Sequence, residues 1–263
     1  MKKLDWIDSD HFSIDGVRFQ CVQRDYSLKS GEDRLVLLKD REMLDNYSRV
    51  VGTDRIRNVL EFGIFQGGSP ALFTLWLELD KFVGIDVCQP VAAFDAFVAR
   101  RALGERIRTH YGVSQADEAR VADIVRNEFG ATPVDLIIDD ASHHYSRTRR
   151  AFEIAFPLLR PGGSYVIEDW GWAHWPTLPA VFRGQTALSM LIMELTMLCA
   201  SRKDIVSEIR IFPSFVVVTK ALAAPPLPDM SLDRLCNKRG VELAGTKHLN
   251  IAGFSRLLAE RFL

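Results

Sequence analysis

The chain has 263 residues, of which 48% are hydrophobic and 25% are charged, a composition typical of a globular protein with a sizeable core. Its 33 basic residues nearly balance its 34 acidic residues, so no strong positive field would attract nucleic acid or an anionic membrane. Four dispersed cysteines without a Cys-x-x-Cys pair argue against a zinc knuckle or a disulfide framework. The amino terminus lacks the apolar run of a signal peptide, and the longest apolar stretch, residues 187–200, is too short to cross a bilayer. We therefore expect a cytoplasmic protein that binds neither nucleic acid nor a membrane.

The first 52 residues are expected to form a cap beside the main domain. Residues 12–23 alternate between apolar and polar side chains as in a short strand or hairpin, whereas residues 35–51 have helical spacing. Charged cap residues such as Lys29, Lys39 and Arg41 have the chemistry to contact a substrate, but such side chains are mostly exposed. The favoured prediction is that they are solvated.

A glycine-rich turn follows the first predicted strand of the main domain. The strand starts at Asn58, the turn contains Gly63 and Gly67, and a helix is predicted with Ser69 as its N-cap and Pro70 as its first residue. Glycines here let a ligand approach the backbone and the helix N-terminus, as a nucleotide-like group would. The spacing Glu-x-Gly-x-x-x-Gly is a poorer match to the Gly-x-Gly-x-x-Gly turn that binds a dinucleotide pyrophosphate.

A second strand, residues 82–86, ends in an acidic residue, Asp86. At this place in a doubly wound sheet a carboxylate can accept hydrogen bonds from both ribose hydroxyls, and together with the glycine-rich turn it favours a bound nucleoside. A helix, a strand, a loop and a second helix are expected next, at residues 94–104, 106–111, 112–117 and 118–129. The loop would lie at the same edge of the sheet, where an adenine ring can bind.

Residues 134–170 are predicted to form a strand, a helix and a second strand. The first strand ends in Asp139 and Asp140 and the second ends in Glu168 and Asp169, while Pro161-Gly162-Gly163 is expected to end the helix between them. A right-handed crossover places the carboxyl ends of both strands at one edge of a parallel sheet.

Four carboxylates at one edge would repel one another unless a cation compensates. A single acidic residue at a strand end is more often a helix cap, but two pairs on neighbouring strands, with His143 shortly after Asp140, indicate a metal site. An all-oxygen ligand set without cysteine favours Mg²⁺, Mn²⁺ or Ca²⁺ over Zn²⁺.

Three tryptophans lie within residues 170–175, on a loop that leaves the acidic edge. They fit either a lid that stacks on a substrate or internal packing of a long loop, and His174 among them is a secondary candidate base. A buried helix, an antiparallel terminal hairpin, a Pro/Ala linker and a helical tail are expected at residues 187–201, 205–220, 221–228 and 229–263. The last ten residues have an amphipathic pattern that would dock on this domain or on another subunit.

These motifs in this order resemble the class I S-adenosylmethionine-dependent methyltransferases. The resemblance is carried by Glu61-x-Gly63-x-x-x-Gly67, Asp86, the Gly112 loop, Asp139-Asp140 and the terminal hairpin. More narrowly, residues 138–143 and 160–169 look like the metal-dependent sugar O-methyltransferases of macrolide biosynthesis and the cephalosporin hydroxylase-like group. The resemblance implies an α/β fold with a Rossmann-like, doubly wound, mostly parallel seven-stranded sheet. It divides the chain into a cap, a methyltransferase core and a tail at residues 1–52, 53–222 and 223–263.

The resemblance also assigns roles to residues. It implies Mg²⁺, or Mn²⁺, bound by Asp140, Glu168 and Asp169, with His143 as the general base and His144 as its main competitor for that role. The implied contacts to S-adenosylmethionine are Glu61, Gly63, Gly67, Ser69, Asp86, Ser114, Asp117 and Asp139.

The implied activity is methylation of one hydroxyl of a vicinal diol, on a sugar of a natural product or glycolipid, by a homo-oligomer. A metal that holds two neighbouring hydroxyls lowers the pKa of the attacked one, and a histidine takes its proton. A catechol-type O-methyltransferase is the first alternative. An NAD-dependent oxidoreductase, which would need the missing Gly-x-Gly-x-x-Gly turn, and a non-catalytic cofactor-binding protein are further ones.

Overall fold

In a computed structural model the chain forms two sheets, and the structure describes residues 1–23, 25–51, 55–177, 180–228 and 230–236. The cap is a small sheet of four strands, β1 (Asp5–Trp6), β2 (His11–Ile14), β3 (Val17–Cys21) and β4 (Leu35–Leu37). The hairpin predicted within residues 12–23 is therefore confirmed. The helix predicted from residue 35 is wrong at its start, because Leu35–Leu37 pairs in parallel with Phe19–Cys21 and helix α1 begins only at Arg41.

The main sheet has seven strands and holds the functional edge. They are β5 (Asn58–Phe62), β6 (Lys81–Asp86), β7 (Ile107–Tyr111), β8 (Val134–Asp139), β9 (Leu159–Glu168), β10 (Val206–Ile211) and β11 (Phe215–Lys220). Their order in the sheet is β10-β11-β9-β8-β5-β6-β7, with β5 to β9 parallel and β11 antiparallel to both of its neighbours. This is the doubly wound sheet with a terminal hairpin that the sequence predicts.

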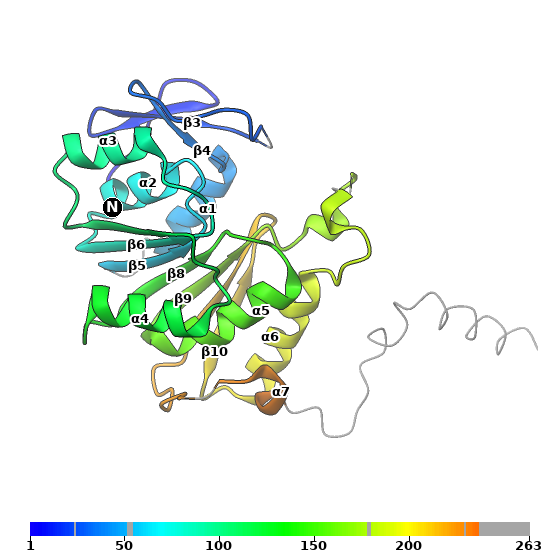
Figure 1. Ribbon diagram of the computed structural model, residues 1–263. Helices are drawn as coiled ribbons and strands as arrows, with labels where there is room; N and C mark the ends of the chain where they lie inside the picture. The colour runs from blue at the N-terminus through cyan, green and yellow to red at the C-terminus, as the bar shows by residue number, and fades with distance from the viewer. Residues whose placement is uncertain (24, 52–54, 178–179, 229, 237–263) are drawn as a thin grey trace, which may run out of the picture.

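Helices cover both faces of the main sheet (Figure 1). One face packs against α1 (Arg41–Val51), α2 (Gly68–Trp76) and α3 (Ala92–Arg100), and the other against α4 (Glu118–Phe129), α5 (Tyr145–Ala155) and α6 (Ser189–Ser201). Adjacent residues of a strand point to opposite faces, so that Val59 belongs to the first core and Leu60 to the second. Both cores are apolar, which explains why the strands read as continuous hydrophobic runs.

The carboxyl-terminal part of the described chain ends in a short helix, α7 (Leu232–Leu235). The amphipathic helix predicted for the last ten residues lies outside the described residues. Within the part of the chain that the structure describes, no helix is long and apolar enough to span a membrane.

The connection between α5 and β9 differs from the prediction. The helix ends at Ala155, a single 3₁₀ turn covers Phe156–Leu158, and β9 then runs through Pro161-Gly162-Gly163 instead of starting after it. Between the pairs Val134↔Leu159 and Leu136↔Ser164, one residue of β8 lies opposite four residues of β9. Gly162, with φ +75°, allows this bulge, because its left-handed backbone suits glycine.

Candidate functional site

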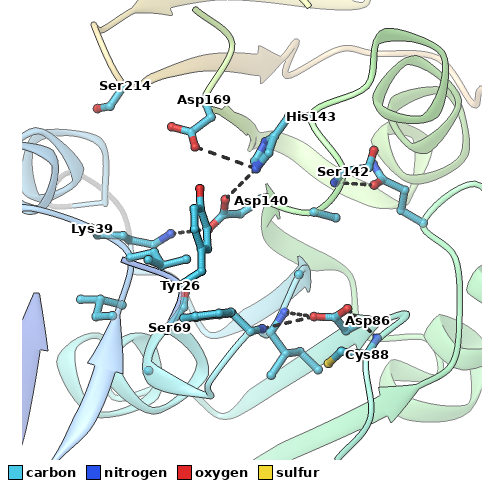
Figure 2. A pocket seen from close by; sticks show the side chains of 18 of the residues that line it. Tyr26, Lys39, Ser69, Asp86, Cys88, Asp140, Ser142, His143, Asp169 and Ser214 are labelled. Carbon is cyan, nitrogen blue, oxygen red and sulfur yellow. Dashed lines mark hydrogen bonds and ion pairs between the residues drawn. The ribbon is translucent and has the colours of Figure 1, made fainter. Parts of the chain in front are cut away.

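A pocket of about 620 Å³ lies at the carboxyl ends of the parallel strands (Figure 2). Its floor comes from the segments that follow β5 to β9, namely residues 63–65, 85–88, 113–115, 140–144 and 169. The cap supplies the opposite wall through residues such as Gln23, Tyr26 and Lys39. The cap thus borders the edge of the sheet at which the predicted site residues meet.

The turn after β5 is held by Asp86, at the end of the neighbouring strand. Its Oδ2 accepts hydrogen bonds from the backbone N–H groups of Ile64 and Phe65, at 2.6 and 3.2 Å, and its Oδ1 accepts one from Cys88. Oδ2 already accepts two hydrogen bonds, and Oδ1 can accept a second one. Asp86 therefore shapes the turn and faces the pocket with remaining acceptor capacity, as the predicted contact to a ribose requires.

Gly63 lets the ends of β5 and β8 approach each other. Its φ is +98°, and a Cβ atom there would lie 2.0 Å from the carbonyl oxygen of Asp140. Replacing Gly63 with alanine should therefore lower the free energy of unfolding by at least about 2 kcal/mol, from backbone strain and overlap together. Urea denaturation of Gly63→Ala measures this. Gly104→Ala is the matched control, because nothing lies within 4 Å of its added Cβ, and equal stability of the two variants would contradict the prediction.

Helix α2 starts two residues earlier than predicted, at Gly68. The N-cap is Gly67, with φ +80°, and not Ser69. A Cβ atom on Gly67 would overlap the ring of Phe94, so this glycine serves close packing between α2 and α3. The Ser69 hydroxyl lines the pocket and donates a hydrogen bond to Glu61.

Glu61 is a fully buried carboxyl group directly behind the pocket lining. Its Oε1 accepts the hydrogen bond from Ser69, while Oε2 has no hydrogen-bond partner among the described residues. Burial raises the pKa of Glu61 to about 8, although Lys39 and Ser69 act in the opposite direction. An unsatisfied buried acceptor fits a ligand that carries a cationic or hydroxyl donor, as S-adenosylmethionine does.

The raised pKa predicts a pH dependence of stability. The folded protein keeps the Glu61 proton to a higher pH than the unfolded chain, whose pKa is near 4.5, so this group favours folding below pH 4.5 and loses that contribution as the pH rises towards about 8. In the absence of ligand, the wild type should lose stability relative to Glu61→Gln across this window. Urea midpoints of both proteins between pH 4.5 and 8.5 test it, and parallel profiles would contradict it.

The other predicted cofactor contacts divide into two groups. Ser114 lines the pocket, but Asp117 caps α4 by accepting a hydrogen bond from the backbone N–H of Arg120. Asp139 is buried, accepts hydrogen bonds from Gln115 and from the Tyr165 hydroxyl, and has its pKa raised to about 7 by burial. Neither aspartate lines the pocket, so the predicted contacts of Asp117 and Asp139 to the cofactor stay predictions.

Gln115 lines the pocket, whereas its hydrogen-bond partner Asp139 does not. Its amide nitrogen donates to the Asp139 carboxylate, and its amide oxygen accepts from the backbone N–H of Ser142. The sequence placed the adenine at this loop but contained no signal for Gln115 itself. A glutamine carries both a donor and an acceptor, so only the fold reveals which buried group it joins.

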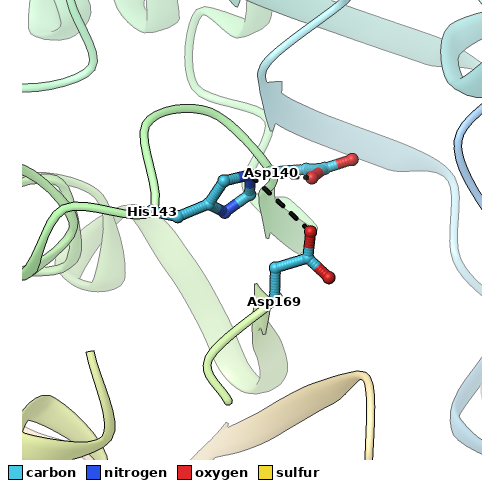
Figure 3. Close-up of side chains that lie close together, drawn as sticks. All are labelled: Asp140, His143 and Asp169. Atoms are coloured by element: carbon cyan, nitrogen blue, oxygen red, sulfur yellow. Dashed lines mark ion pairs between the residues drawn. The ribbon is translucent and has the colours of Figure 1, made fainter. Parts of the chain in front are cut away.

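Asp140, His143 and Asp169 converge at one end of the pocket (Figure 3). One potential ligand atom of each lies within 4.8 Å of the others, and His143 Nε2 is 3.8 Å from Asp140 Oδ1 and 3.9 Å from Asp169 Oδ2. His143 and Asp169 have φ values of +52° and +51°. Left-handed backbone at residues other than glycine costs energy and is concentrated at functional sites.

Hydrogen bonds from neighbouring segments fix this group. The backbone N–H of Asp140 donates to the carbonyl of Phe62 at the end of β5, and that of Asp169 donates to the carbonyl of Ser214 in the terminal hairpin. The indole N–H of Trp172 donates to the carbonyl oxygen of His143, 2.9 Å away. Three strand ends and the tryptophan loop therefore position the three side chains.

Glu168, which the sequence groups with Asp140 and Asp169, is separated from Asp140 by the ammonium group of Lys39. It is buried, does not line the pocket, and accepts hydrogen bonds from Lys39 and from the Tyr47 hydroxyl. The expectation that Lys39 is solvated is wrong, because its side chain is only 1% exposed. Its position in the sequence, among the charged residues of the cap, gave no indication of burial.

The tryptophan loop combines the two roles that the sequence left open. Trp172 is buried and stacks on Phe182, with ring centroids 4.2 Å apart, whereas Trp175 lines the pocket. His174 is exposed, approaches the hydroxyl of Ser189 and does not line the pocket, so its position does not suit the role of a secondary base. His144 lines the pocket but pairs with Gln185.

Residues 60–170 match a family model described as a methyltransferase domain. The chain is 31% identical over 139 residues to mycinamicin VI 2''-O-methyltransferase of Micromonospora griseorubida, which is 50% of this chain and 31% of that protein. It is 35% identical over 152 residues to L-olivosyl-oleandolide 3-O-methyltransferase of Streptomyces antibioticus, 56% of this chain and 38% of that one. The chain thus spans only about a third of the length of these curated relatives.

Solved structures give the same fold. The MycE methyltransferase from the mycinamycin biosynthetic pathway, in complex with Mg and SAH, is 25% identical, with a TM-score of 0.50 over 68% of this chain and 48% of that one. A protein from Staphylococcus aureus described as a caffeoyl-CoA O-methyltransferase is 18% identical, with a TM-score of 0.53 over 70% of this chain and 86% of that one. The second likeness supports the fold alone.

Proposed function

We propose that this chain transfers a methyl group from S-adenosylmethionine to a hydroxyl of a small molecule, because residues 60–170 match a family model described as a methyltransferase domain. The acceptor is a vicinal diol on a sugar of a natural product or glycolipid, and the reaction depends on Mg²⁺ or Mn²⁺. The relatives named for methylation of glycosylated macrolide-type compounds support this acceptor class.

One observation carries the proposal. Asp140, His143 and Asp169 lie at one end of the pocket whose floor also includes the turn at Gly63 and the carboxylate of Asp86. A nucleoside held by the turn and a hydroxyl held near the acidic group would share this pocket. Methyl transfer requires such proximity, because the donor methyl is already electrophilic and the main task is alignment of the attacking oxygen.

The donor set fits a hard divalent cation. Asp140 and Asp169 would hold the ion through carboxylate oxygens, which Mg²⁺ and Mn²⁺ prefer, and both remain partly accessible from the pocket. When bound, the ion supplies orientation of two neighbouring hydroxyls and a lower pKa for the one that is attacked. His143 remains beside them as a base.

The side chains of this protein perform the remaining steps. His143 Nε2, which faces both carboxylates, accepts the hydroxyl proton as the new oxygen–carbon bond forms and the sulfur–carbon bond of the donor breaks. The turn at Gly63 and the Asp86 carboxylate hold the nucleoside half of the donor. The cap wall limits the access of water to the site.

The catechol-type alternative is favoured by one feature. Tyr26 and Trp175 both line the pocket and present aromatic side chains to a ligand. A planar catechol stacks well on such rings, but the apolar face of a sugar also packs against them. Both acceptors are vicinal diols, so they would use the same acidic group.

An acceptor comparison tests the proposal. Purified protein is incubated with methyl-labelled S-adenosylmethionine, Mg²⁺ and matched pairs of acceptors, a rhamnoside with its 2-deoxy analogue and catechol with phenol. We expect label in the rhamnoside and little in the deoxy analogue. Transfer to catechol alone would select the alternative, and equal transfer to diol and deoxy sugar would contradict chelation of a diol.

The oligomeric state and the division of the chain belong to this proposal as well. We expect residues 53–222 to act as the catalytic core of a homo-oligomer, with the cap at residues 1–52 on the acceptor side and residues 223–263 as the tail. The cap residues Gln23 and Tyr26 in the pocket wall support the placement of the acceptor.

A further inference from the structure

The ammonium group of Lys39 contacts two of the predicted metal ligands, Asp140 (Figure 2) and Glu168. Its Nζ is 2.8 Å from Asp140 Oδ2, and 2.8 and 2.6 Å from the two carboxylate oxygens of Glu168. Three carboxylate oxygens from two strand ends thus surround one buried positive charge. Such an arrangement resembles the way in which acidic residues surround a bound metal ion.

Lys39 separates Glu168 from the pocket. Lys39 lines the pocket and Glu168 does not, and the Glu168 carboxylate already accepts hydrogen bonds from Lys39 and Tyr47. An ion that enters from the pocket meets Asp140, His143 and Asp169 first. It can reach Glu168 only if the ammonium group leaves.

The fold holds Lys39 in this place from both sides. Strand β4 ends two residues before it at Leu37, and α1 begins two residues after it at Arg41, where Asp40 accepts a hydrogen bond from the backbone N–H of Met43. Three carboxylate oxygens lie within 2.8 Å of Nζ, which is the surrounding of an ammonium group and not of a neutral amine.

We propose that Lys39 is an internal cation that competes with the divalent metal for Asp140 and Glu168, and so sets the metal affinity of the site. This inference rests on the metal site of the proposed function. With Lys39 present, the formal charge of Asp140, Glu168, Asp169 and Lys39 is −2, which a divalent ion neutralises. Without Lys39 the charge is −3, Asp140 Oδ2 is released, and Glu168 becomes accessible, so the ion binds more tightly.

Titration of the full-length protein with Mn²⁺, with free Mn²⁺ followed by electron paramagnetic resonance, tests this without any activity measurement. Lys39→Met should lower the Kd for Mn²⁺ by at least about tenfold. Lys29→Met is the matched control, because it removes the same charge from an exposed position of the cap and should leave the Kd unchanged.

Lys39→Met alone leaves the buried carboxylate of Glu168 without its cationic partner, and a second pair of variants avoids this. Glu168→Gln and the double variant Lys39→Met/Glu168→Gln differ only at Lys39, and the double variant leaves neither buried charge behind. The double variant should bind Mn²⁺ more tightly than Glu168→Gln, because Asp140 no longer pairs with the ammonium group.

Two negative results have different meanings. If the wild type binds Mn²⁺ but removal of Lys39 fails to tighten binding in both backgrounds, the competition is refuted while the proposed metal site stands. If neither the wild type nor any variant binds Mn²⁺, the metal site itself is refuted, and the inference about Lys39 with it.

Discussion

Replacing His143 with alanine should lower kcat by about 10²- to 10⁴-fold, the usual contribution of a general base. Nε2 of this residue faces Asp140 and Asp169, and no other histidine of the described residues has this position. Binding of S-adenosylhomocysteine should be unchanged, because the Gly63 turn and Asp86 lie elsewhere in the pocket. Initial rates of methyl transfer and calorimetry with S-adenosylhomocysteine measure the two quantities separately.

The matched control is His174→Ala. His174 is exposed on the tryptophan loop, approaches Ser189 and does not line the pocket. This variant should retain the rate of the wild type. A His143→Ala protein that turns over at the normal rate would remove His143 from the proposed mechanism. Equal losses of rate in the two variants would show that the loss is not specific to His143.

Removal of divalent metal should abolish turnover. A metal that lowers the pKa of an aliphatic hydroxyl supplies several kcal/mol of transition-state stabilisation, equivalent to roughly 10³-fold in rate. EDTA should therefore stop the reaction and excess Mg²⁺ or Mn²⁺ should restore it, while Zn²⁺ should restore it poorly because the site contains two carboxylates and no thiolate. Full activity in EDTA would refute the metal requirement.

The same requirement can be tested at a single ligand. Asp169→Asn should raise the Kd for Mn²⁺ at least about tenfold and lower the rate to match, because one charged ligand becomes a neutral amide. Asp123→Asn is the control, because its exposed carboxylate on α4 pairs with Arg126 and lies outside the pocket lining. Equal losses of Mn²⁺ affinity and of rate in the two variants would show a general effect of removing a negative charge, and not the loss of a metal ligand.

The parallel sheet could be predicted from the sequence because its evidence is local. The β-branched runs that end at Asp86, Asp140 and Glu168, with helices between them, allow only one handedness of crossover, which brings the strand ends to one edge. The same reasoning placed Asp140, His143 and Asp169 near one another, as the structure does.

The contributions of the cap could not be predicted, because they depend on contacts that are distant in the sequence. Lys39 pairs with residues 101 and 129 positions away, and no local pattern distinguishes it from the exposed Lys29. The three residues of β4 form a strand only because they pair with β3. The helical spacing of residues 35–51 contains no sign of this pairing, and it therefore predicts a helix there. The direction in which a side chain points at the end of a strand could not be predicted either, as the burial of Asp139 shows.

In the proposed site, Asp140 and Asp169 hold one divalent ion beside the methyl donor. The most direct measurement is anomalous diffraction from crystals grown with Mn²⁺ and S-adenosylhomocysteine. We expect one strong manganese peak at bonding distance from carboxylate oxygens of both aspartates, in the pocket that holds the nucleoside against Asp86 and the Gly63 turn. A manganese peak remote from both aspartates, or a nucleoside bound outside this pocket, would contradict it.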